Sequence, residues 1–436
     1  MSNVDVATPP ETGHVTTIAT ILISTFFLGG GSALQGSALV LRGVLEGFSD
    51  PVIGLISSSY YAGVLAGSFV AIPVIRNVGY IRTFAAFASL GSASAIAHIL
   101  WIQPTVWIAL RLLHGVSFAV VFVVVESWLN VVSPSAHRGR ILSMYSITYL
   151  ASIGLVQPLL GVFPPAGFEL FGITTILISL CILPITLANV SAVATVARVR
   201  IRMAQIIKRS PLGVGGVFAS GIVAGAHFSM APRFGQNLGL QDGTIGLFLL
   251  IISLGTVVMQ WPLGILSDAT GRRSALTVGA GVGCIAAVAI SFSPGSGVWL
   301  TTMAFLFGGF ALPLYSLSIA TVNDQLLSEE MVQSAGALYV IYGLGSMFGP
   351  LVAAGMMDWG GPAALYWMIA LVLFAYLLFM LLQQSLHPEF AVRGGTEEYH
   401  PYPRTTVISL RMLQRFVPRS GSTTKKRGST SPEPGE

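Results

Sequence analysis

Charged side chains are scarce in this sequence. Asp, Glu, Lys and Arg make up 9% of the 436 residues, whereas hydrophobic residues make up 53% and the mean hydropathy is +0.78. A water-soluble domain of this length needs far more charge to stay dissolved. The composition therefore excludes such a domain and predicts a protein that is embedded in a lipid bilayer.

Several chemical signatures are also missing. Cys181 and Cys284 are the only cysteines; both fall in apolar segments and provide neither a disulfide framework nor metal-ligand spacing. No G-x-x-x-x-G-K-[ST] loop occurs, which argues against direct use of ATP. No nucleophile, base and orienting group recur at useful spacing, so we expect no enzyme, cofactor or metal site. Residues 1–15 lack a basic region, and we expect no cleaved signal peptide.

Long apolar segments dominate what is present. A membrane-spanning helix needs about 20 apolar residues, and twelve segments meet this requirement. They are residues 16–41, 52–75, 83–101, 105–132, 141–163, 168–189, 211–232, 243–266, 274–293, 298–322, 332–356 and 362–383. The expected fold is all-α and integral to the membrane, with twelve transmembrane helices.

An internal repeat divides these helices into two sets of six. Features of the first half recur after a constant offset of 192 residues (242 − 50 = 192). Asp50, Gly54, Gly79 and Pro158 have counterparts at Asp242, Gly246, Gly271 and Pro350. Such symmetry is typical of transporters that bind substrate where the halves meet. We expect two pseudo-symmetric halves at 16–190 and 211–383, each burying its interface against the other in a monomer.

The distribution of Lys and Arg predicts the orientation in the membrane. With residues 1–15 in the cytoplasm, the inner loops carry most of the basic residues, and the outer loops carry only Arg42 and Arg233. This pattern places both termini in the cytoplasm, in a bacterial inner membrane. The loop 323–331, with Asp324, is acidic although it should be cytoplasmic. Topology explains the net charge of +5, so no nucleic-acid partner is expected.

Two basic segments lie outside the helices. The linker 191–210 is expected to form an interfacial helix attracted to anionic lipids. The tail 384–436 contains a weakly amphipathic stretch at 402–418 that is suited to the inner leaflet. The composition of its last residues predicts disorder.

The loop after the eighth predicted helix carries a distinctive motif, Gly264-Ile-Leu-Ser-Asp268-Ala-Thr-Gly271-Arg272-Arg273. It resembles the G-x-L-x-D-x-x-G-R-R signature of the major facilitator superfamily. The resemblance implies a cytoplasmic gate in which Asp268 faces the positive end of a helix in the other half. A simple topogenic charge cluster is the alternative.

The first-half copy of this motif has diverged. It retains Gly79, but Arg76 occupies the acidic position. A cation there cannot satisfy a helix N-terminus, so closure is expected to depend mainly on Asp268. The other basic residues assigned to the gate are Arg82, Arg138 and Arg140.

The fourth predicted helix contains Arg111-Leu-Leu-His114-Gly115, which resembles the R-x-x-x-G element of the superfamily. Arg111 lies about two turns inside the helix, where an arginine is costly unless it faces water, a carbonyl or an anion. We expect it to favour a substrate with an anionic group; a side chain that reaches the headgroups is the alternative. His114 is expected to be a hydrogen-bonded packing residue.

Glu126 is the one carboxylate placed far from the start of a predicted helix, since Glu169 is the second residue of the sixth. A glutamate removed from water can take up a proton near neutral pH, as proton-driven transport requires. It lies near the cytoplasmic end of its helix, close in sequence to Arg138 and Arg140. A role in the cytoplasmic gate and a role in proton coupling therefore both remain open.

Helices five and eleven contain Gln157-Pro158 and Gly345-Ser-Met-Phe-Gly349-Pro350. These resemble the superfamily's G-x-x-x-G-P element, which is intact only in helix eleven. Glycine and proline allow close packing and bending there. Two further blocks, Ser57-Ser-Ser-Tyr60 and Val123-Val-Val-Glu126-Ser127, resemble a little-characterised bacterial branch of the superfamily.

The resemblance implies a cavity lined by helices one, four, seven and ten, with helices two, five, eight and eleven at its flanks. Polar or aromatic residues on these helices form the candidate substrate site. They are Gln35, Tyr60, Arg111, Tyr145, Tyr149, Gln157, His227, Gln260, Tyr315, Tyr339 and Tyr342.

Secondary transport of a small molecule by alternating access is the function these features favour. Proton-coupled export of an amphipathic compound is the first expectation, and uptake of an organic anion or nutrient is the alternative. A transport-inactive ligand sensor is the rival outside transporters. The expected partners are a small-molecule substrate, membrane lipids and protons.

Overall fold

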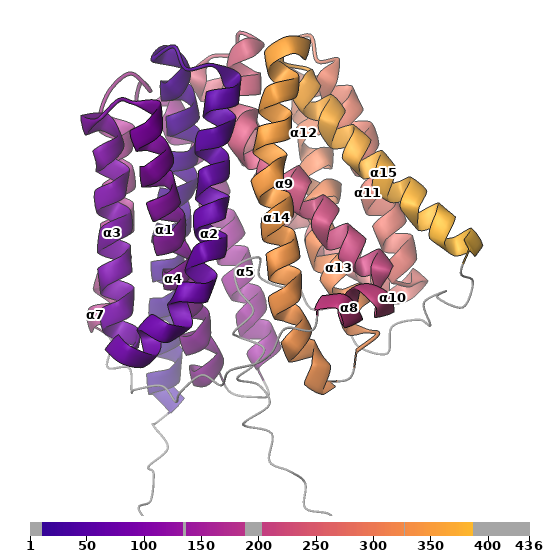
Figure 1. Ribbon diagram of the computed structural model, residues 1–436, viewed down its shortest axis with the longest axis horizontal. Coiled ribbons are helices and arrows are strands. Elements are labelled where there is room, and N and C mark those ends of the chain that lie inside the picture. The colour runs from indigo at the N-terminus through magenta and orange to yellow at the C-terminus, as the bar shows by residue number, and fades with distance from the viewer. Residues whose placement is uncertain (1–10, 134–136, 188–202, 327, 387–436) are drawn as a thin grey trace, which may run out of the picture.

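The computed structural model describes residues 11–133, 137–187, 203–326 and 328–386, and these residues are entirely helical apart from short connections (Figure 1). Within them, twelve helical spans are long and apolar enough to cross a membrane. This confirms the predicted fold class. The predicted inner-leaflet helix at 402–418 and the basic residues at 191–202 lie outside the described residues. The rest of the predicted linker contains the short helix α8 (Met203–Arg209).

The first six spans are built from seven α-helices and one 3-10 helix. These are α1 (Glu11–Leu45), α2 (Asp50–Val78), α3 (Tyr80–Leu100), α4 (Pro104–Val132), α5 (Arg138–Leu155), the 3-10 helix η1 (Gln157–Gly161), α6 (Glu169–Leu180) and α7 (Ile182–Leu187). The second six spans are built from seven α-helices. These are α9 (Pro211–Asn237), α10 (Asp242–Thr270), α11 (Arg272–Ser291), α12 (Val298–Ala311), α13 (Leu314–Asn323), α14 (Ser328–Gly360) and α15 (Ala364–Leu386).

Proline breaks three spans that the sequence predicts as single helices. The fifth changes from α5 to the tighter η1 around Pro158, the sixth breaks between α6 and α7 just before Pro184, and the tenth breaks between α12 and α13 at Pro313. Proline has no N–H for the carbonyl four residues earlier, and its ring crowds that carbonyl. In contrast, α14 continues through Pro350.

Two equivalent glycines separate consecutive helices by a single residue. Gly79 lies between α2 and α3 with a φ of 91°, and Gly271 lies between α10 and α11 with a φ of 92°. A side chain at this positive φ is strained, so both turns require glycine. The repeat recognised in the sequence thus extends to backbone conformation.

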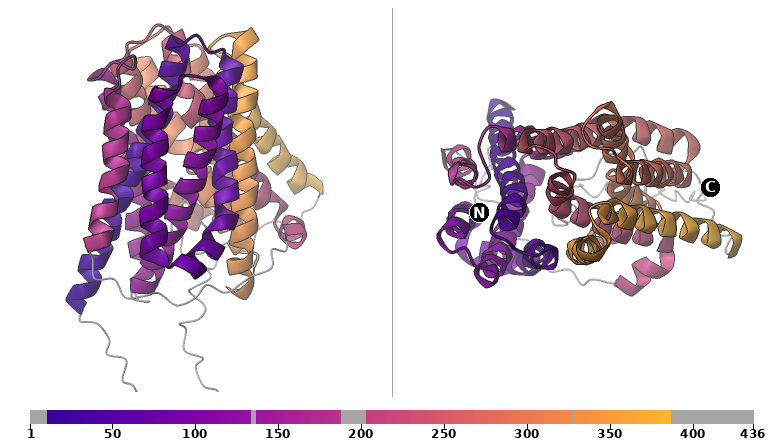
Figure 2. Two further views of the ribbon diagram at one scale, coloured as in Figure 1. Left: turned by 60° about the vertical axis from the view of Figure 1, so that its left-hand side comes forward. Right: turned by 90° about the horizontal axis from the view of Figure 1, so that it is seen from above.

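The two halves lie side by side in the view from above (Figure 2). Helices α2 and α14 approach each other at the top of Figure 1 and diverge towards the bottom. We call the end of the molecule at which α2 and α10 begin the closed end, because the halves meet there in close backbone contact.

These contacts at the closed end follow the repeat. A Cβ added to Gly54 would lie 2.9 Å from the carbonyl oxygen of Pro350, and a Cβ added to Gly246 would lie 3.2 Å from the Cα of Pro158. Glycine is therefore required for the halves to approach this closely. The proline-containing elements of spans five and eleven thus form part of the interface between the halves.

An ion pair reinforces the closed end. The Nε of Arg233 donates to Oδ1 of Asp50 at 2.6 Å, which links α9 to α2. Arg233 was expected in a loop, but α9 continues to Asn237 and carries it on the helix. Arg42, also expected in a loop, lies in the last turn of α1 and pairs with Glu46 at 2.6 Å.

Candidate functional site

A cavity of about 1270 Å³, including its open part, lies between the two halves. Its described lining comes from α1, α2, α4 and α5 with η1 in the first half, and from α9, α10 and α14 in the second. Helix ten was expected to contribute as well, but α12 and α13 supply none of the described lining residues. Their Tyr315 packs against the ring of Tyr342 at 4.5 Å, and Tyr342 faces the cavity instead.

Seven of the eleven candidate residues line this cavity. They are Tyr60, Arg111, Tyr149, Gln157, His227, Tyr339 and Tyr342. The structure therefore brings together side chains that lie up to 282 positions apart in the sequence (342 − 60 = 282).

The other four candidates are outside the described lining and contact neighbouring side chains. Gln35 lies 3.5 Å from a ring nitrogen of His98, Gln260 reaches Ser316 at 3.5 Å, and Tyr145 donates to Glu126 at 3.2 Å. Tyr315 is the fourth. In this conformation these four residues make contacts with neighbouring side chains, and their contact with a ligand stays a prediction.

Serines and further aromatic residues make up much of the remaining wall, and the sequence reasoning missed them. They are Ser32, Ser37, Ser57, Ser229, Ser253, Ser346, Tyr61, Phe118, Phe122 and Phe228. One usable signal was present, since Ser37 and Ser229 are themselves repeat counterparts (229 − 37 = 192). Serine in an apolar helix is otherwise as compatible with packing as with binding.

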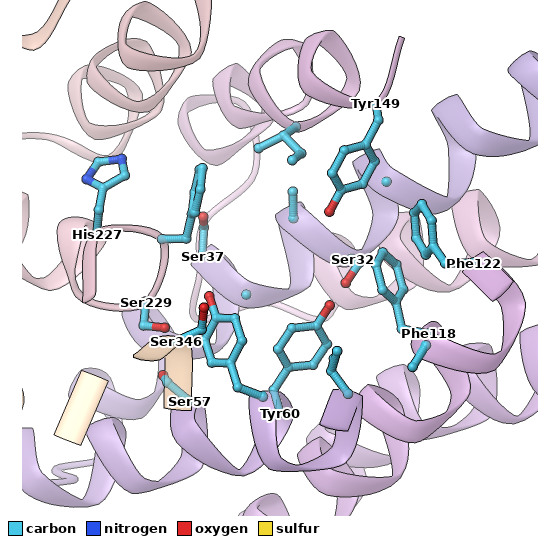
Figure 3. A pocket seen from close by; sticks show the side chains of 18 of the residues that line it. Ser32, Ser37, Ser57, Tyr60, Phe118, Phe122, Tyr149, His227, Ser229 and Ser346 are labelled. Carbon is cyan, nitrogen blue, oxygen red and sulfur yellow. The ribbon is translucent and has the colours of Figure 1, made fainter. Parts of the chain in front are cut away.

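Figure 3 shows the labelled phenylalanines and most of the labelled serines on different sides of the cavity, with Ser32 on the side of the phenylalanines. Phe118, Phe122 and Tyr149 gather on one side, and Ser37, Ser57, Ser229 and Ser346 lie with His227 on the other. His227 is held by the hydroxyl of Tyr366, 3.2 Å from Nδ1. The cavity is thus amphipathic, with an aromatic wall and a hydroxyl-rich wall.

Arg111 is the charged residue among the described lining residues. It is 7% exposed, and its guanidinium carbon lies 4.4 Å from the centre of the Tyr60 ring. Glycines hold the two residues together: Gly63 packs on the Leu112 backbone and Gly115 on the Tyr60 backbone. Within the described residues, Nη1 of Arg111 is buried without a hydrogen-bond partner.

Arg111 also borders a second, smaller cavity of about 240 Å³ within the first half. Ile53 and Trp107 line this cavity, and both lie near the closed end, at the beginning of α2 and of α4. Arg111 and Ser57 line both cavities. The arginine therefore stands in the wall between the central space and the closed end.

Glu126 lies deeper in α4 and is fully buried. Its Oε1 accepts a hydrogen bond from Tyr145, and it is close enough to Tyr339 of the other half to interact electrostatically. It is not among the described lining residues of the cavity. This position near the interface between the halves is compatible with both roles considered for it.

The loop motif between α10 and α11 forms an ion cluster within the second half. Arg272, which is 2% exposed, donates to Asp268 at 2.7 Å and to Asp324 at 2.8 Å. Asp324, which belongs to the acidic loop predicted on the cytoplasmic side, thus neutralises the buried Arg272. In this conformation Asp268 is bonded inside its own half, and its contact with the other half remains a prediction for the alternative conformation.

The remaining residues assigned to the gate are spread over the same end of the molecule. Arg76, Arg82 and Arg140 are exposed, and Gly264 is buried. Arg273 donates to the carbonyl of Met380. The side chain of Arg138 lies outside the described residues.

Comparison with known proteins settles the family. The sequence model of the Major Facilitator Superfamily matches residues 21–326 and 212–417. The chain is a member of the Major Facilitator Superfamily. It is accordingly a secondary transporter and an integral membrane protein rather than an enzyme.

Two similar relatives within the superfamily are uncharacterised. The chain is 30% identical over 340 residues to the uncharacterised MFS-type transporter YcaD of Escherichia fergusonii, covering 77% of this chain and 87% of that protein. It is 28% identical over 347 residues to an uncharacterised MFS-type transporter of Enterobacter sp. strain 638, with the same coverage. These matches agree with the little-characterised bacterial branch that the sequence motifs resemble.

Solved superfamily structures share the fold. The nucleoside transporter NupG superposes with a TM-score of 0.67 at 12% identity, covering 85% of this chain and 98% of that one. A bacterial homologue of the human lysosomal transporter Spinster, in an inward-facing and unoccupied conformation, superposes with a TM-score of 0.63 at 13% identity, covering 94% and 99%. At these identities the likeness establishes the fold alone.

Proposed function

We propose that this transporter carries an amphipathic organic anion, and that Arg111 binds the anionic group. The observation that carries the proposal is the position of Arg111. This buried residue lines the central cavity and lies over the ring of Tyr60, and its Nη1 has no hydrogen-bond partner among the described residues. An unneutralised cation inside a membrane protein is costly and is normally kept for function.

The geometry of the guanidinium supports this assignment. Its central carbon lies 4.4 Å from the centre of the Tyr60 ring, and this contact uses none of its N–H groups in a hydrogen bond to that ring's hydroxyl. A carboxylate or phosphate accepts guanidinium N–H groups in pairs, so the contact with the ring and anion binding are compatible. The described lining contains no carboxylate that competes for these donors.

The walls of the cavity supply the rest of the recognition. The aromatic side around Phe118, Phe122 and Tyr149 suits a flat or apolar body, and the serines opposite suit hydrogen-bonding groups. Ligand sites commonly combine an apolar lining with a few polar groups that fix orientation. The substrate class is therefore an anion with an apolar or aromatic body and a few hydrogen-bonding groups.

We infer that the closed end faces the periplasm, with both termini in the cytoplasm of a bacterium. The distribution of Lys and Arg supports this orientation. The conformation is then inward-facing, like that of the solved Spinster homologue. Arg111 borders a cavity on either side of the wall at this end, as expected of a residue that serves both conformations.

The sequence favours export driven by protons, and uptake of the anion is the alternative. Glu126 is a candidate both for proton coupling and for the cytoplasmic gate. Transport is supported over a sensor by the intact ion cluster at Arg272 and by the glycine contacts between the halves. These are elements of an interface that opens and closes.

A matched series of ligands tests the substrate class. Three compounds with the same aromatic body would be compared by thermal shift on the purified protein: 3-(4-hydroxyphenyl)propionate, its amide, and tyramine. We expect the carboxylate to stabilise the wild type and the neutral and cationic compounds to have little effect. A wider panel of organic anions, each with its amide, extends the series.

Variants of Arg111 make the test specific. Arg111→Gln should abolish the stabilisation and Arg111→Lys should weaken it at least tenfold, because lysine cannot donate in pairs. Lys208→Gln, at an exposed lysine of α8, should behave as wild type. Equal binding of anions and amides, or full binding in Arg111→Gln, would exclude the proposed site.

Flux measurements then separate transport from sensing. The stabilising anion would be placed inside or outside proteoliposomes of known protein orientation, with a pH gradient of either sign. Accumulation on one side gives the direction of transport. Saturable binding without movement of the anion would favour the sensor.

A further inference from the structure

A set of buried polar side chains connects the cavity to the interior of the first half. Ser32, which lines the cavity, lies 3.4 Å from Nε2 of His114. The other ring nitrogen, Nδ1, lies 3.1 Å from the hydroxyl of Ser94 and 3.3 Å from the carbonyl of Gly91. His114 is 1% exposed, so the imidazole lies directly behind the cavity wall.

These contacts determine which nitrogen of His114 is available for a proton. The carbonyl of Gly91 can only accept, so Nδ1 of the neutral ring carries the hydrogen. Nε2 then presents its lone pair to Ser32 at the cavity wall. Ser32 itself lines the cavity, so Nε2 faces a hydroxyl group that borders the cavity.

The second half shows that the fold does not require these polar residues. Gly63 packs against the Leu112 backbone, and its repeat counterpart Gly255 packs against the Phe305 backbone, which sets an offset of 193 between α4 and α12 (305 − 112 = 193). On this register Arg111 corresponds to Ala304 and His114 to Phe307.

The same asymmetry holds for α3 and α11, which both start directly after the equivalent glycines Gly79 and Gly271. Ser94 and His98 correspond there to Ala286 and Ile290. Buried apolar residues therefore satisfy the same packing positions in the second half. The polar set in the first half is a local addition to the repeated fold.

The charged and titratable groups around His114 come from three helices. Arg111 lies one turn earlier on α4, Tyr60 of α2 has its ring 6.0 Å from the imidazole, and His98 of α3 is bonded to the Ser94 carbonyl at 2.6 Å. The neighbouring positions on α1 are Ser32 and Gln35, which do not titrate. Glu126 lies twelve residues further along α4, about 18 Å away along the helix axis.

Arg111 therefore dominates the electrostatics at His114. Two positive charges one turn apart in an apolar wall repel each other strongly. An anion bound to Arg111 removes most of this repulsion, so the anion and a proton on His114 assist each other's binding. By linkage this assistance is reciprocal.

We propose that His114 is the proton-binding site of this transporter, and that its proton is carried together with the anion held by Arg111. Transport of both in one direction favours uptake of the anion, the alternative given above, over proton-driven export. The inference rests on the proposed function for the Arg111 partner. With a monovalent anion and a proton both bound, the wall carries the same net charge as the empty wall. The loaded and empty transporter then face the same electrostatic cost when they change conformation.

One test requires no substrate. The full-length protein, labelled with ¹⁵N in its histidine side chains, would be titrated by NMR in detergent micelles between pH 5 and 9. His114→Asn identifies the signal. We expect His114 in Arg111→Gln to titrate at least about one pH unit above wild type, the size of effect typical of a close like charge. Lys208→Gln, at an exposed lysine, serves as the control and should match wild type.

An unchanged midpoint in Arg111→Gln, or no titration of His114 in either protein, would overturn the proton site. This result is independent of whether any anion in the ligand series binds. A different outcome is that no anion of the ligand series binds while the His114 midpoint shifts in Arg111→Gln. That outcome would overturn the proposed substrate class and retain the linkage between Arg111 and His114.

Proton uptake on binding provides the second measurement. The probe is 3-(4-hydroxyphenyl)propionate, added to weakly buffered protein with a pH indicator. We expect about one proton to be taken up per anion bound in wild type and in Glu126→Gln, and none in His114→Gln. Loss of uptake in Glu126→Gln alone would assign the proton to Glu126 and refute the assignment to His114.

Discussion

Arg233 Nε lies 2.6 Å from Asp50 Oδ1, and this ion pair joins the two halves of the transporter at the closed end of its cavity. The repeat does not duplicate it. Asp50 has a counterpart in Asp242, but the position equivalent to Arg233 is Leu41 (233 − 192 = 41). One asymmetric ion pair thus supplements two symmetric glycine contacts.

Breaking this ion pair is predicted to favour opening of the closed end. A cysteine at Ser57, which lines both cavities, would report accessibility in a variant that lacks Cys181 and Cys284. Arg233→Gln should raise its labelling by an impermeant thiol reagent roughly fivefold, because a partly exposed ion pair contributes about 1 kcal/mol. The double variant Asp50→Arg, Arg233→Asp exchanges the two charges and can re-form the ion pair, so it should restore slow labelling.

Arg42→Gln provides the matched control. It removes an ion pair of the same length at the same end, but Arg42 in the last turn of α1 and Glu46 just after that helix both belong to the first half. An increase in labelling of equal size in this variant would show that general loss of stability, and not release of the halves, is responsible.

The glycine contacts predict a stronger effect on the same equilibrium. Gly246→Ala should oppose closure, because its Cβ would collide with the Gln157 carbonyl of the other half. Transport should fall while labelling through the closed end rises. Gly355→Ala is the control, since its Cβ meets nothing within 4 Å. Normal transport by Gly246→Ala would mean that the contact is dispensable.

Tyr60 is predicted to orient Arg111 through its ring, whose centre lies 4.4 Å from the guanidinium carbon. Tyr60→Leu should weaken binding of an anionic ligand about tenfold, since a desolvated cation–π contact contributes about 1–2 kcal/mol. Tyr60→Phe keeps the ring and should bind the anion nearly as well. The comparison is made by ligand titration, and equal losses in both variants would argue against the ring as the cause.

Asp324 is predicted to be more important for stability than Asp268. Both bond to the buried Arg272, but the side chain of Asp324 is 10% exposed and that of Asp268 is 36% exposed. Asp324→Asn should lower the free energy of unfolding by about 3 kcal/mol, and Asp268→Asn by about 1 kcal/mol. Unfolding by SDS in mixed micelles measures both; equal losses would contradict the burial argument.

The sequence predicted the spans well because lipid imposes a simple rule. A helix must be apolar over the thickness of the bilayer, so composition alone located all twelve. Breaks at Pro184 and Pro313 were missed because a proline inside an apolar helix can bend, break or be tolerated, as Pro350 is in α14. Which outcome occurs depends on the packing of neighbouring helices.

The candidate site was predicted unevenly. Arg111 was found because a charge in a membrane helix is rare. The serines of the cavity and the relation of His114 to Ser32 were missed, because serine and histidine are also ordinary partners in buried hydrogen bonds. Their spacing along one chain does not show which helix they face.

The sequence by itself determined the membrane setting, the two repeated halves and the presence of an isolated cation in the fourth span. Scarcity of charge and a constant offset are properties of the chain that survive any arrangement of helices. Only the tertiary structure decided that Arg111 stacks on Tyr60, that Arg233 reaches Asp50 across the halves, and that Asp324 neutralises Arg272. These contacts join residues 51, 183 and 52 positions apart, and such pairings arise from helix packing that no local pattern encodes.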